Sequence, residues 1–216
     1  MKFKPILFST PMVQAILEGR KTQTRRIIPK VDQMIPFSDK SFSYLSIDGC
    51  FVIDNGNGKF MDGLKPKFNI DDVLWVRETW QDLECFDYHM KDFAYKADKA
   101  ASTHAEEYKI KWIPSIFMPK DAARVFLKIT GIRVERLHDI SEEDSISEGI
   151  EKMSVWKNRL VENLYTNYMK DGRGPQTPRL SFFSLWEAIN GKDSLASNPY
   201  VWVYDFCKVE KPTNFI

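Results

Sequence analysis

The stretch ILFSTPMVQAILEGRKTQTRRII, residues 6–28, decides the fold, because it reads as strand, helix, turn and strand in quick succession. Ile6 to Phe8 predicts a short strand. Thr10-Pro11 predicts the start of a helix, with the threonine as N-cap and the proline in the first helical position. Gly19 is placed to end that helix. A basic turn then leads into a second strand, which Pro29 stops, so the chain opens with two strands joined by a helix.

After residue 28 the sequence predicts further strands and helices, but they do not alternate as a repeated βαβ series. Strands are predicted over runs of β-branched and aromatic residues: Asp72–Arg77, Val125–Thr130, Ile132–Leu137 and Tyr200–Phe206. Helices are predicted after the capping box Ser141–Asp144, over Lys157–Met169 and over Phe182–Ile189, where Asn190-Gly191 ends the last. Scattered strands with isolated helices are typical of an α+β protein.

Three stretches lack a clear pattern and are interpreted as insertions in a single domain that spans 1–216. They lie around 30–70, 83–115 and 151–180. The first is expected to be rich in loops, with a hairpin turn at 54–58, where the sequence is Asp-Asn-Gly-Asn-Gly. The second contains Tyr95 in a predicted short strand.

The charge of the chain is balanced overall and uneven locally. It has 31 basic and 30 acidic residues, a net charge of +1, which argues against a strong sequence-independent DNA binder. Residues 1–30, however, contain seven basic residues and one acidic residue, a local excess of +6 (7 − 1). A basic site on a neutral protein predicts a bounded anionic ligand rather than a long polyanion track.

Several classes of protein are disfavoured. The three cysteines show no CxxC spacing, so neither a zinc knuckle nor a disulfide framework is expected, and no metal or other cofactor is implied. The N-terminus does not read as a signal peptide, and no apolar run approaches the ~20 residues of a membrane span. A cytoplasmic protein that does not associate with membranes is the expectation.

Four blocks of this sequence resemble the ASCH family, in particular its longer members from bacteriophage and prophage genomes. They are residues 6–26, Asp72–Trp80 (DVLWVRETW), Val134–Ile150 (VERL to EGI) and Asn198–Val203 (NPYVWV). The resemblance implies a small mixed or antiparallel β-barrel with flanking helices, related to the RNA-binding PUA domain. It implies RNA, single-stranded DNA or a modified nucleoside as the partner.

One ASCH branch, the small bacterial N4-acetylcytidine amidohydrolases, carries a similar Gly-Arg-Lys-Thr-x-Thr-x-Arg segment and uses a lysine, a threonine and a glutamate. By this resemblance the three fall on Lys21, Thr24 and Glu148. The chain departs from those enzymes in being about twice as long and in having Arg25 where they have an apolar residue.

The three residues have chemistry that suits amide hydrolysis, which needs a nucleophile, a base and donors for the oxyanion. Thr24 can supply the nucleophilic oxygen. Lys21 can act as the base if burial or neighbouring cations lower its pKa, and Glu148 can orient the ammonium and move protons. The alternative is structural: Lys21 in a solvated turn and Thr24 as an ordinary strand residue.

The position of Glu148 on its helix leaves its environment open. Ile146, Ile150 and Met153 predict the apolar face of that helix, and Glu148 lies almost opposite Ile146. It is therefore solvated or faces a cleft. Gly149 can also end the helix early and free Glu148 to turn.

Five further residues are candidate ligand contacts. Arg20 and Arg26 flank Lys21 and Thr24 in the basic turn and are expected to contact an anion. Trp75, on the predicted strand at 72–77, is a candidate for stacking on a base, with Trp80 as the alternative. Arg77, with the Glu78 that follows it, is a candidate for a phosphate or a base edge. The alternative is a buried ion pair or a packed tryptophan.

Three functions remain open. We favour a module that binds a nucleotide or nucleic acid in a cleft around Gly19–Arg26. The first alternative is an amidohydrolase acting on N4-acylated cytidine or a related nucleobase amide, and the second is a ribonuclease. The hydrolase requires Lys21, Thr24 and Glu148 to converge on one cleft.

Overall fold

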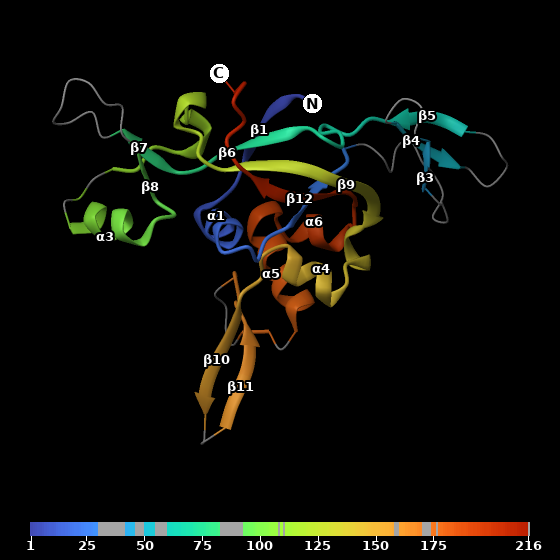
Figure 1. The fold of residues 1–216 in the computed structure, drawn as a ribbon. Coiled ribbons are helices and arrows are strands. Elements are labelled where there is room, and N and C mark those ends of the chain that lie inside the picture. The colour runs from blue at the N-terminus through green and yellow to red at the C-terminus, as the bar shows by residue number, and fades with distance from the viewer. Residues whose placement is uncertain are drawn as a thin grey trace. The chain divides into compact units, whose positions relative to one another are not determined.

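The computed structural model describes residues 1–29, 42–45, 50–54, 60–82, 93–107, 109, 111–157, 160–169, 174–175 and 177–215. The protein is α+β, as predicted (Figure 1). It divides into two compact units. Unit 1 comprises Met1–Thr22, Asp71–Ile129 and Phe206–Ile216, and unit 2 comprises Gln23–Ile70 and Thr130–Asp205. The segments of the two units alternate along the chain, so neither unit is one continuous piece of sequence. The expectation of a single domain over 1–216 stays a prediction.

Unit 1 is built on a parallel pair of strands. β1 (Phe3–Leu7) pairs with β6 (Val73–Arg77), and β6 pairs antiparallel with the first part of β9 (Phe126–Arg136). The other elements of the unit are α1 (Thr10–Leu17), β7 (Trp80–Asp82), β8 (Phe93–Tyr95), α3 (Lys99–Glu107) and the 3₁₀ turns η1 (Ser115–Phe117) and η2 (Lys120–Ala122). β7 and β8 pair antiparallel.

Unit 2 holds the antiparallel pair of β2 (Gln23–Ile27) with β12 (Tyr200–Val209), in the register Thr24 opposite Tyr204. Its helical elements are η3 (Leu137–Asp139), α4 (Glu142–Ser147), α5 (Pro178–Asn190) and α6 (Lys192–Ala196). Two antiparallel sheets complete it: β3 (Phe42–Leu45), β4 (Cys50–Asp54) and β5 (Phe60–Leu64) form one, and β10 (Lys152–Lys157) with β11 (Leu160–Tyr165) forms the other.

The strands β1, β6, β9, β12 and β2 belong, in that order, to one mixed five-stranded sheet. The long strands β9 and β12 each begin in one unit and end in the other. Among the strands that the structure describes, no closed barrel is found. The mixed sheet with helices is therefore established, and the PUA-like barrel stays a proposal.

Each unit has its own apolar core. In unit 1 the buried residues Val73, Ala123, Phe126 and Phe215 form one cluster. In unit 2 a cluster gathers residues of η3, α5 and β12, among them Leu137, Phe182, Trp186, Val201 and Val203. Burying an aliphatic or aromatic side chain of this size contributes about 1.5–3 kcal/mol, so these clusters are a main source of stability for each unit.

Several predicted boundaries agree with the structure. α1 begins at Thr10, although Ser9 rather than Thr10 occupies the N-cap position. Gly19 follows the helix with φ 77°, and Gly191 follows α5 with φ 85°, both in the left-handed region that favours glycine. The side chain of Ser141 accepts a hydrogen bond from the amide of Asp144 at 3.0 Å, as the capping box predicted.

One prediction of secondary structure is wrong, and a second stretch holds strands beside the turn that its sequence predicted. The helix expected over Lys157–Met169 is absent; β10 and β11 instead form an antiparallel pair from Lys152 opposite Tyr165 to Lys157 opposite Leu160. The stretch around 30–70, expected to be loop-rich, contributes the β3–β4–β5 sheet. The predicted turn at 54–58 connects β4 to β5, but 55–59 lie outside the described residues.

Candidate functional site

The basic turn begins where α1 ends. The left-handed conformation of Gly19 reverses the chain, and the amides of Arg20 and Lys21 then both donate to the carbonyl of Ala15, at 2.8 and 3.0 Å. Lys21 is only 2% exposed, and its Nζ lies 5.6 Å from the centre of the Phe8 ring. The structural alternative for Lys21, a solvated lysine in a turn, is therefore wrong.

Arg20 differs from Lys21 in its surroundings. Its guanidinium forms an ion pair with Glu18, with Nε 2.8 Å from Oε2, and both side chains are partly exposed. An exposed pair of this kind contributes little to stability and exchanges readily with other anions. Arg20 is thus placed where the expected contact with an anion is feasible.

A pocket of about 710 Å³ lies in unit 1 beside the start of α1. Pockets that bind small molecules span about 300–1,000 Å³, so its size suits a ligand as large as a nucleotide. Its polar lining consists of four hydroxyl side chains and one lysine: Ser9, Thr10, Thr79, Ser115 and Lys96. Phe8, whose ring lies near the ammonium of Lys21, also lines the pocket.

Trp75 and Arg77 lie on one side of β6, while Leu74 and Val76 on the other side are fully buried. The guanidinium carbon of Arg77 is 5.6 Å from the centre of the Trp75 ring. Arg77 donates from Nε to the carbonyl of Met118 at 3.2 Å, and from Nη2 to the carbonyl of Ile116. Its guanidinium thus holds the backbone around η1, and its contact with a ligand stays a prediction.

Glu78 is 1% exposed and forms a two-pronged ion pair with Arg124, at 2.9 Å from Nε and 3.1 Å from Nη2. Arg124 also binds Asp98, at 2.8 Å, and lies 3.8 Å above the Tyr95 ring. Although burial opposes its charge, the hydrogen bonds and charges of Glu78 and Asp98 raise the pKa of Arg124. The buried ion pair considered for this segment is present, with Arg124 as the cation.

Thr24 and Glu148 both belong to unit 2 and are 2% and 4% exposed. Glu148 directly follows α4, and Gly149, with φ 93°, turns the chain away from the helix axis. The apolar face predicted for this helix is wrong: α4 ends at Ser147, and Ile146 is 46% exposed. The early end anticipated at Gly149 is confirmed, and Glu148 is buried rather than solvated.

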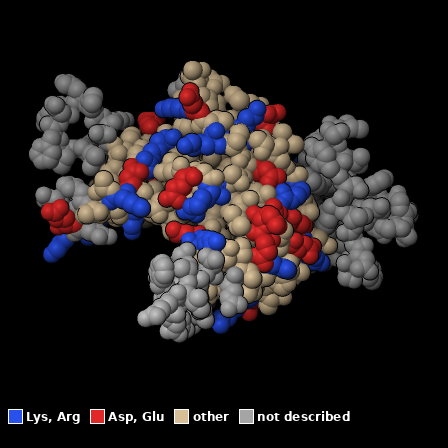
Figure 2. Space-filling model, turned by 60° about the horizontal axis from the view of Figure 1, so that its bottom comes forward, with Lys and Arg blue, Asp and Glu red and all other residues tan. Residues whose placement is uncertain are grey.

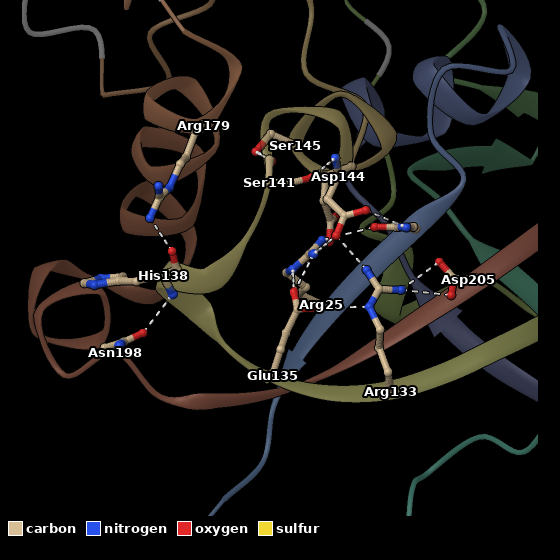
Figure 3. Close-up of polar contacts among 12 residues, drawn as sticks. Arg25, Arg133, Glu135, His138, Ser141, Asp144, Ser145, Arg179, Asn198 and Asp205 are labelled. Carbon is tan, nitrogen blue, oxygen red and sulfur yellow. Dashed lines mark hydrogen bonds and ion pairs between the residues drawn. The ribbon is translucent and has the colours of Figure 1, made fainter. Parts of the chain in front are cut away.

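Arg25 lies at the centre of a charge network in unit 2 (Figure 3). Its side chain has no exposed surface. It donates to Glu135 from Nη2 at 2.6 Å and from Nε at 2.9 Å, to Asp144 at 2.9 Å and to Glu148 at 3.1 Å. Three carboxylates surround one guanidinium, so Arg25 has little capacity left for an anionic ligand.

Arg133 extends the same network toward β12. It binds Asp144 at 2.6 Å, Asp205 at 3.0 Å and Glu135 at 3.2 Å. Burial opposes the charge of Asp144, but the hydrogen bond from Gln23 and the charges of Arg133 and Arg25 outweigh it and lower its pKa. The ionised form of Asp144 is therefore favoured within this network.

Arg26 has an environment unlike that of Arg25. Burial lowers its pKa, although the charge of Glu148 and the Tyr204 hydroxyl act in the opposite direction. Burial also raises the pKa of Tyr204 to about 12. Glu148 already acts on the charge of Arg26, so a contact of this residue with an anionic ligand stays a prediction.

The surface drawn in Figure 2 carries acidic and basic side chains side by side. Acidic side chains gather in one place on this face, with single basic ones around them. The described part of this face thus carries charges of both signs, and the bounded anionic ligand expected from the net charge stays a prediction.

The predicted site residues are divided between the two units. Unit 1 contains Lys21, Trp75, Arg77 and Glu78. Unit 2 contains Thr24, Arg26 and Glu148. Sequence reasoning missed Lys96, Arg124, Arg133 and Glu135. A usable signal for the last two was the alternation Arg133-Val134-Glu135, which puts two opposite charges on one side of a strand. Lys96 gave no local signal, because only the tertiary fold brings it beside the start of α1.

Among the residues that the structure describes, no group of three or more histidine, cysteine or carboxylate side chains is arranged to hold a metal ion. No helix in the described ranges is long and apolar enough to cross a bilayer. Comparison with known proteins gives no assignment: no family model, no curated protein and no solved structure matches this chain.

Proposed function

We propose that this protein is an ASCH-type module that binds a nucleotide-type ligand, with the pocket beside α1 as the binding site. The observation that carries the proposal is the pocket itself. It is large enough for a nucleotide, it presents hydroxyl groups and the ammonium of Lys96, and it is bordered by Phe8 close to Lys21. No residue of the Gly19–Arg26 turn lines this pocket, although Gly19–Thr22 belong to the same unit, so the cleft expected around the turn stays part of the proposal.

The chemistry of the lining fits a ligand with one anionic group and several polar ones. Hydroxyl side chains donate and accept hydrogen bonds, which suits sugar hydroxyls and base edges, and a lysine supplies one positive charge for a phosphate. The absence of a large net charge agrees with a ligand of this size. We extend the proposal to a single-stranded RNA or DNA segment whose terminal nucleotide enters the pocket.

The finer features implied by the ASCH resemblance belong to the same proposal. They are the PUA-like barrel, the bacteriophage or prophage type and the cytoplasm as the compartment. The strand–helix–strand order of β1, α1 and β2, with Gly19 ending the helix, supports the resemblance. The ribonuclease alternative has no observation of its own in its favour.

Amide hydrolysis is the second candidate, favoured by the burial of Lys21, Thr24 and Glu148. The burial of a lysine, a threonine and a glutamate, each at most 4% exposed, fits a catalytic role, and the ion pair with Arg25 at 3.1 Å is a structural reason for the burial of Glu148. In this proposal the Thr24 hydroxyl attacks the acyl carbonyl of an N4-acylated cytidine and gives up its proton to a base, the role that the resemblance implies for Lys21. The N4–carbonyl bond breaks, cytidine leaves with a proton, and water then releases the acid from Thr24.

One experiment tests both candidates. The protein is titrated with N4-acetylcytidine, cytidine and cytidine monophosphate by calorimetry, and the same mixtures are followed by mass spectrometry for loss of the acetyl group. Binding without deacetylation supports the module, and deacetylation that Thr24→Ala abolishes and Thr24→Ser retains in part supports the enzyme. Wild-type protein that binds none of the three compounds contradicts the proposed function.

A further inference from the structure

The chain from Ser115 to Met118 is held in place by the segment that follows β6. Arg77 binds the carbonyls of Ile116 and Met118, and the amide of Glu78 donates to the Met118 sulfur at 3.1 Å. Two residues further on, Trp80 and Ile113 exchange backbone hydrogen bonds at 3.1 and 2.8 Å. The η1 turn is therefore fixed at both of its ends.

This fixed turn exposes two large apolar side chains. Ile116 is 57% exposed and Phe117 is 68% exposed, whereas Met118, the next residue, is 1% exposed. The residue that begins the turn, Ser115, lines the pocket, and Phe117 follows it two residues later. An aromatic side chain held on a rigid turn beside a pocket loses little entropy when it contacts a ligand, which is the usual advantage of preorganisation.

We infer that η1 supplies the base contact next to the pocket, with Phe117 as a stacking surface for a nucleobase and the pocket residue Lys96 as the contact for the phosphate of the same nucleotide. The inference rests on the proposed function and specifies it: the ligand is a nucleoside phosphate whose base contacts Phe117 and whose phosphate contacts Lys96. Aromatic stacking tolerates any base, because every base has a flat face.

The same geometry gives Arg77 a positioning role. Its guanidinium, packed on Trp75, fixes the two carbonyls that determine the course of η1. Trp75 and Arg77, which the sequence predicted as ligand contacts, thus hold the turn that carries Phe117, the residue that we expect to contact the base.

The test compares two single variants of the full-length protein, Phe117→Ala and Lys96→Gln, in titrations with cytidine monophosphate and with cytidine. Phe117→Ala is expected to weaken the binding of both by about tenfold or more, since it removes the stacking surface. Lys96→Gln is expected to weaken cytidine monophosphate by about tenfold and to leave cytidine unchanged, and the loss for the phosphate should shrink as salt rises.

Matched controls are available in the same unit. Leu17→Ala removes another exposed apolar side chain, and Lys111→Gln removes another exposed lysine; neither residue lines the pocket. Both controls should bind like the wild type, and all four variants should keep its melting temperature. If cytidine monophosphate binds and neither Phe117→Ala nor Lys96→Gln weakens it beyond the controls, the inference is overturned while the proposed function stands. If the wild type binds neither compound, both are overturned.

Discussion

The side chain of Arg25 shows how a residue of a basic turn can belong to the scaffold. It has no exposed surface and contacts three carboxylates, from β9, α4 and the residue after α4. Removing one partner from such a buried network leaves uncompensated charges, and this typically costs about 3–5 kcal/mol. By contrast, Arg20 pairs with Glu18 at the surface, where an ion pair contributes about 0–1 kcal/mol.

We therefore expect Arg25→Met to lower the free energy of unfolding by about 3–5 kcal/mol, because Glu135, Asp144 and Glu148 lose their shared cation. Arg20→Met is the matched control and should cost no more than about 1 kcal/mol. Urea unfolding followed by tryptophan fluorescence measures both. Equal and small losses in the two variants would show that the network adds no stability.

Asp144 makes the same network sensitive to acid. Its folded-state pKa lies below the ordinary value of 3.8, so its contribution to stability is present above that value and is lost as the pH falls through the folded-state pKa. Asp144→Asn removes this contribution, so the variant should be less stable than the wild type at pH 7. The difference should shrink below about pH 4, the ordinary range of an aspartate. Urea unfolding at pH 7 and pH 3 checks the sign, and a difference that stays constant would contradict the assignment.

The sequence could indicate which residues are candidates for the site, but it could not indicate whether those residues are buried or exposed. The motif around Gly19–Arg26 singled out Lys21 and Thr24, yet nothing in the local sequence required them to be 2% exposed. Burial of a turn lysine depends on which segments pack over it, and the sequence does not give that information. Glu148 is buried because α4 ends one residue before it. Gly149 predicted this early end, whereas the apolar spacing of Ile146, Ile150 and Met153 predicted a longer helix.

At the scale of the element, local signals were decisive where backbone chemistry alone sets a boundary. Pro11 and Gly19 placed α1, the capping box placed the start of α4, and Gly191 placed the end of α5, whose start at Pro178 lies four residues before the predicted one. Gly131 lies inside β9, which is continuous there. A Cβ at residue 131 would lie 2.7 Å from the Asp205 carboxylate, so the glycine permits a close approach between the two residues.

An antiparallel pair of strands takes the place of the helix predicted over Lys157–Met169. The segment has residues that suit either state, and its pairing with Lys152–Lys157 decides the outcome. Strand pairing across a hairpin is a tertiary choice, so periodicity within one segment could not determine it. The same holds for β3, β4 and β5 in the stretch around 30–70, whose strands form a sheet only with one another.

At the scale of the whole molecule, the two chain ends meet in one core. Phe215, next to the last residue, is 7% exposed and contacts the rings of Phe3 and Phe126, with centroids 5.2 and 4.8 Å apart. Trp75 of β6 lies on the same ring at 6.2 Å. Unit 1 therefore depends on three segments that are distant in the sequence, and no continuous piece of the chain contains its whole core.

We expect Phe215→Ala to lower the free energy of unfolding by about 3–5 kcal/mol, because it opens a cavity among three aromatic rings. Phe117→Ala makes the same chemical change at a side chain that is 68% exposed and should stay within about 0.5 kcal/mol of the wild type. Denaturant unfolding measures both, and a chain truncated after residue 211 should unfold at least as readily as Phe215→Ala.

Because the Phe215 ring packs on residues of β1, β6 and β9, its loss should lower the stability of all three strands together, and hydrogen exchange of their amides would show this. Loss of protection confined to the last strand would contradict the view that the chain ends complete the core of unit 1.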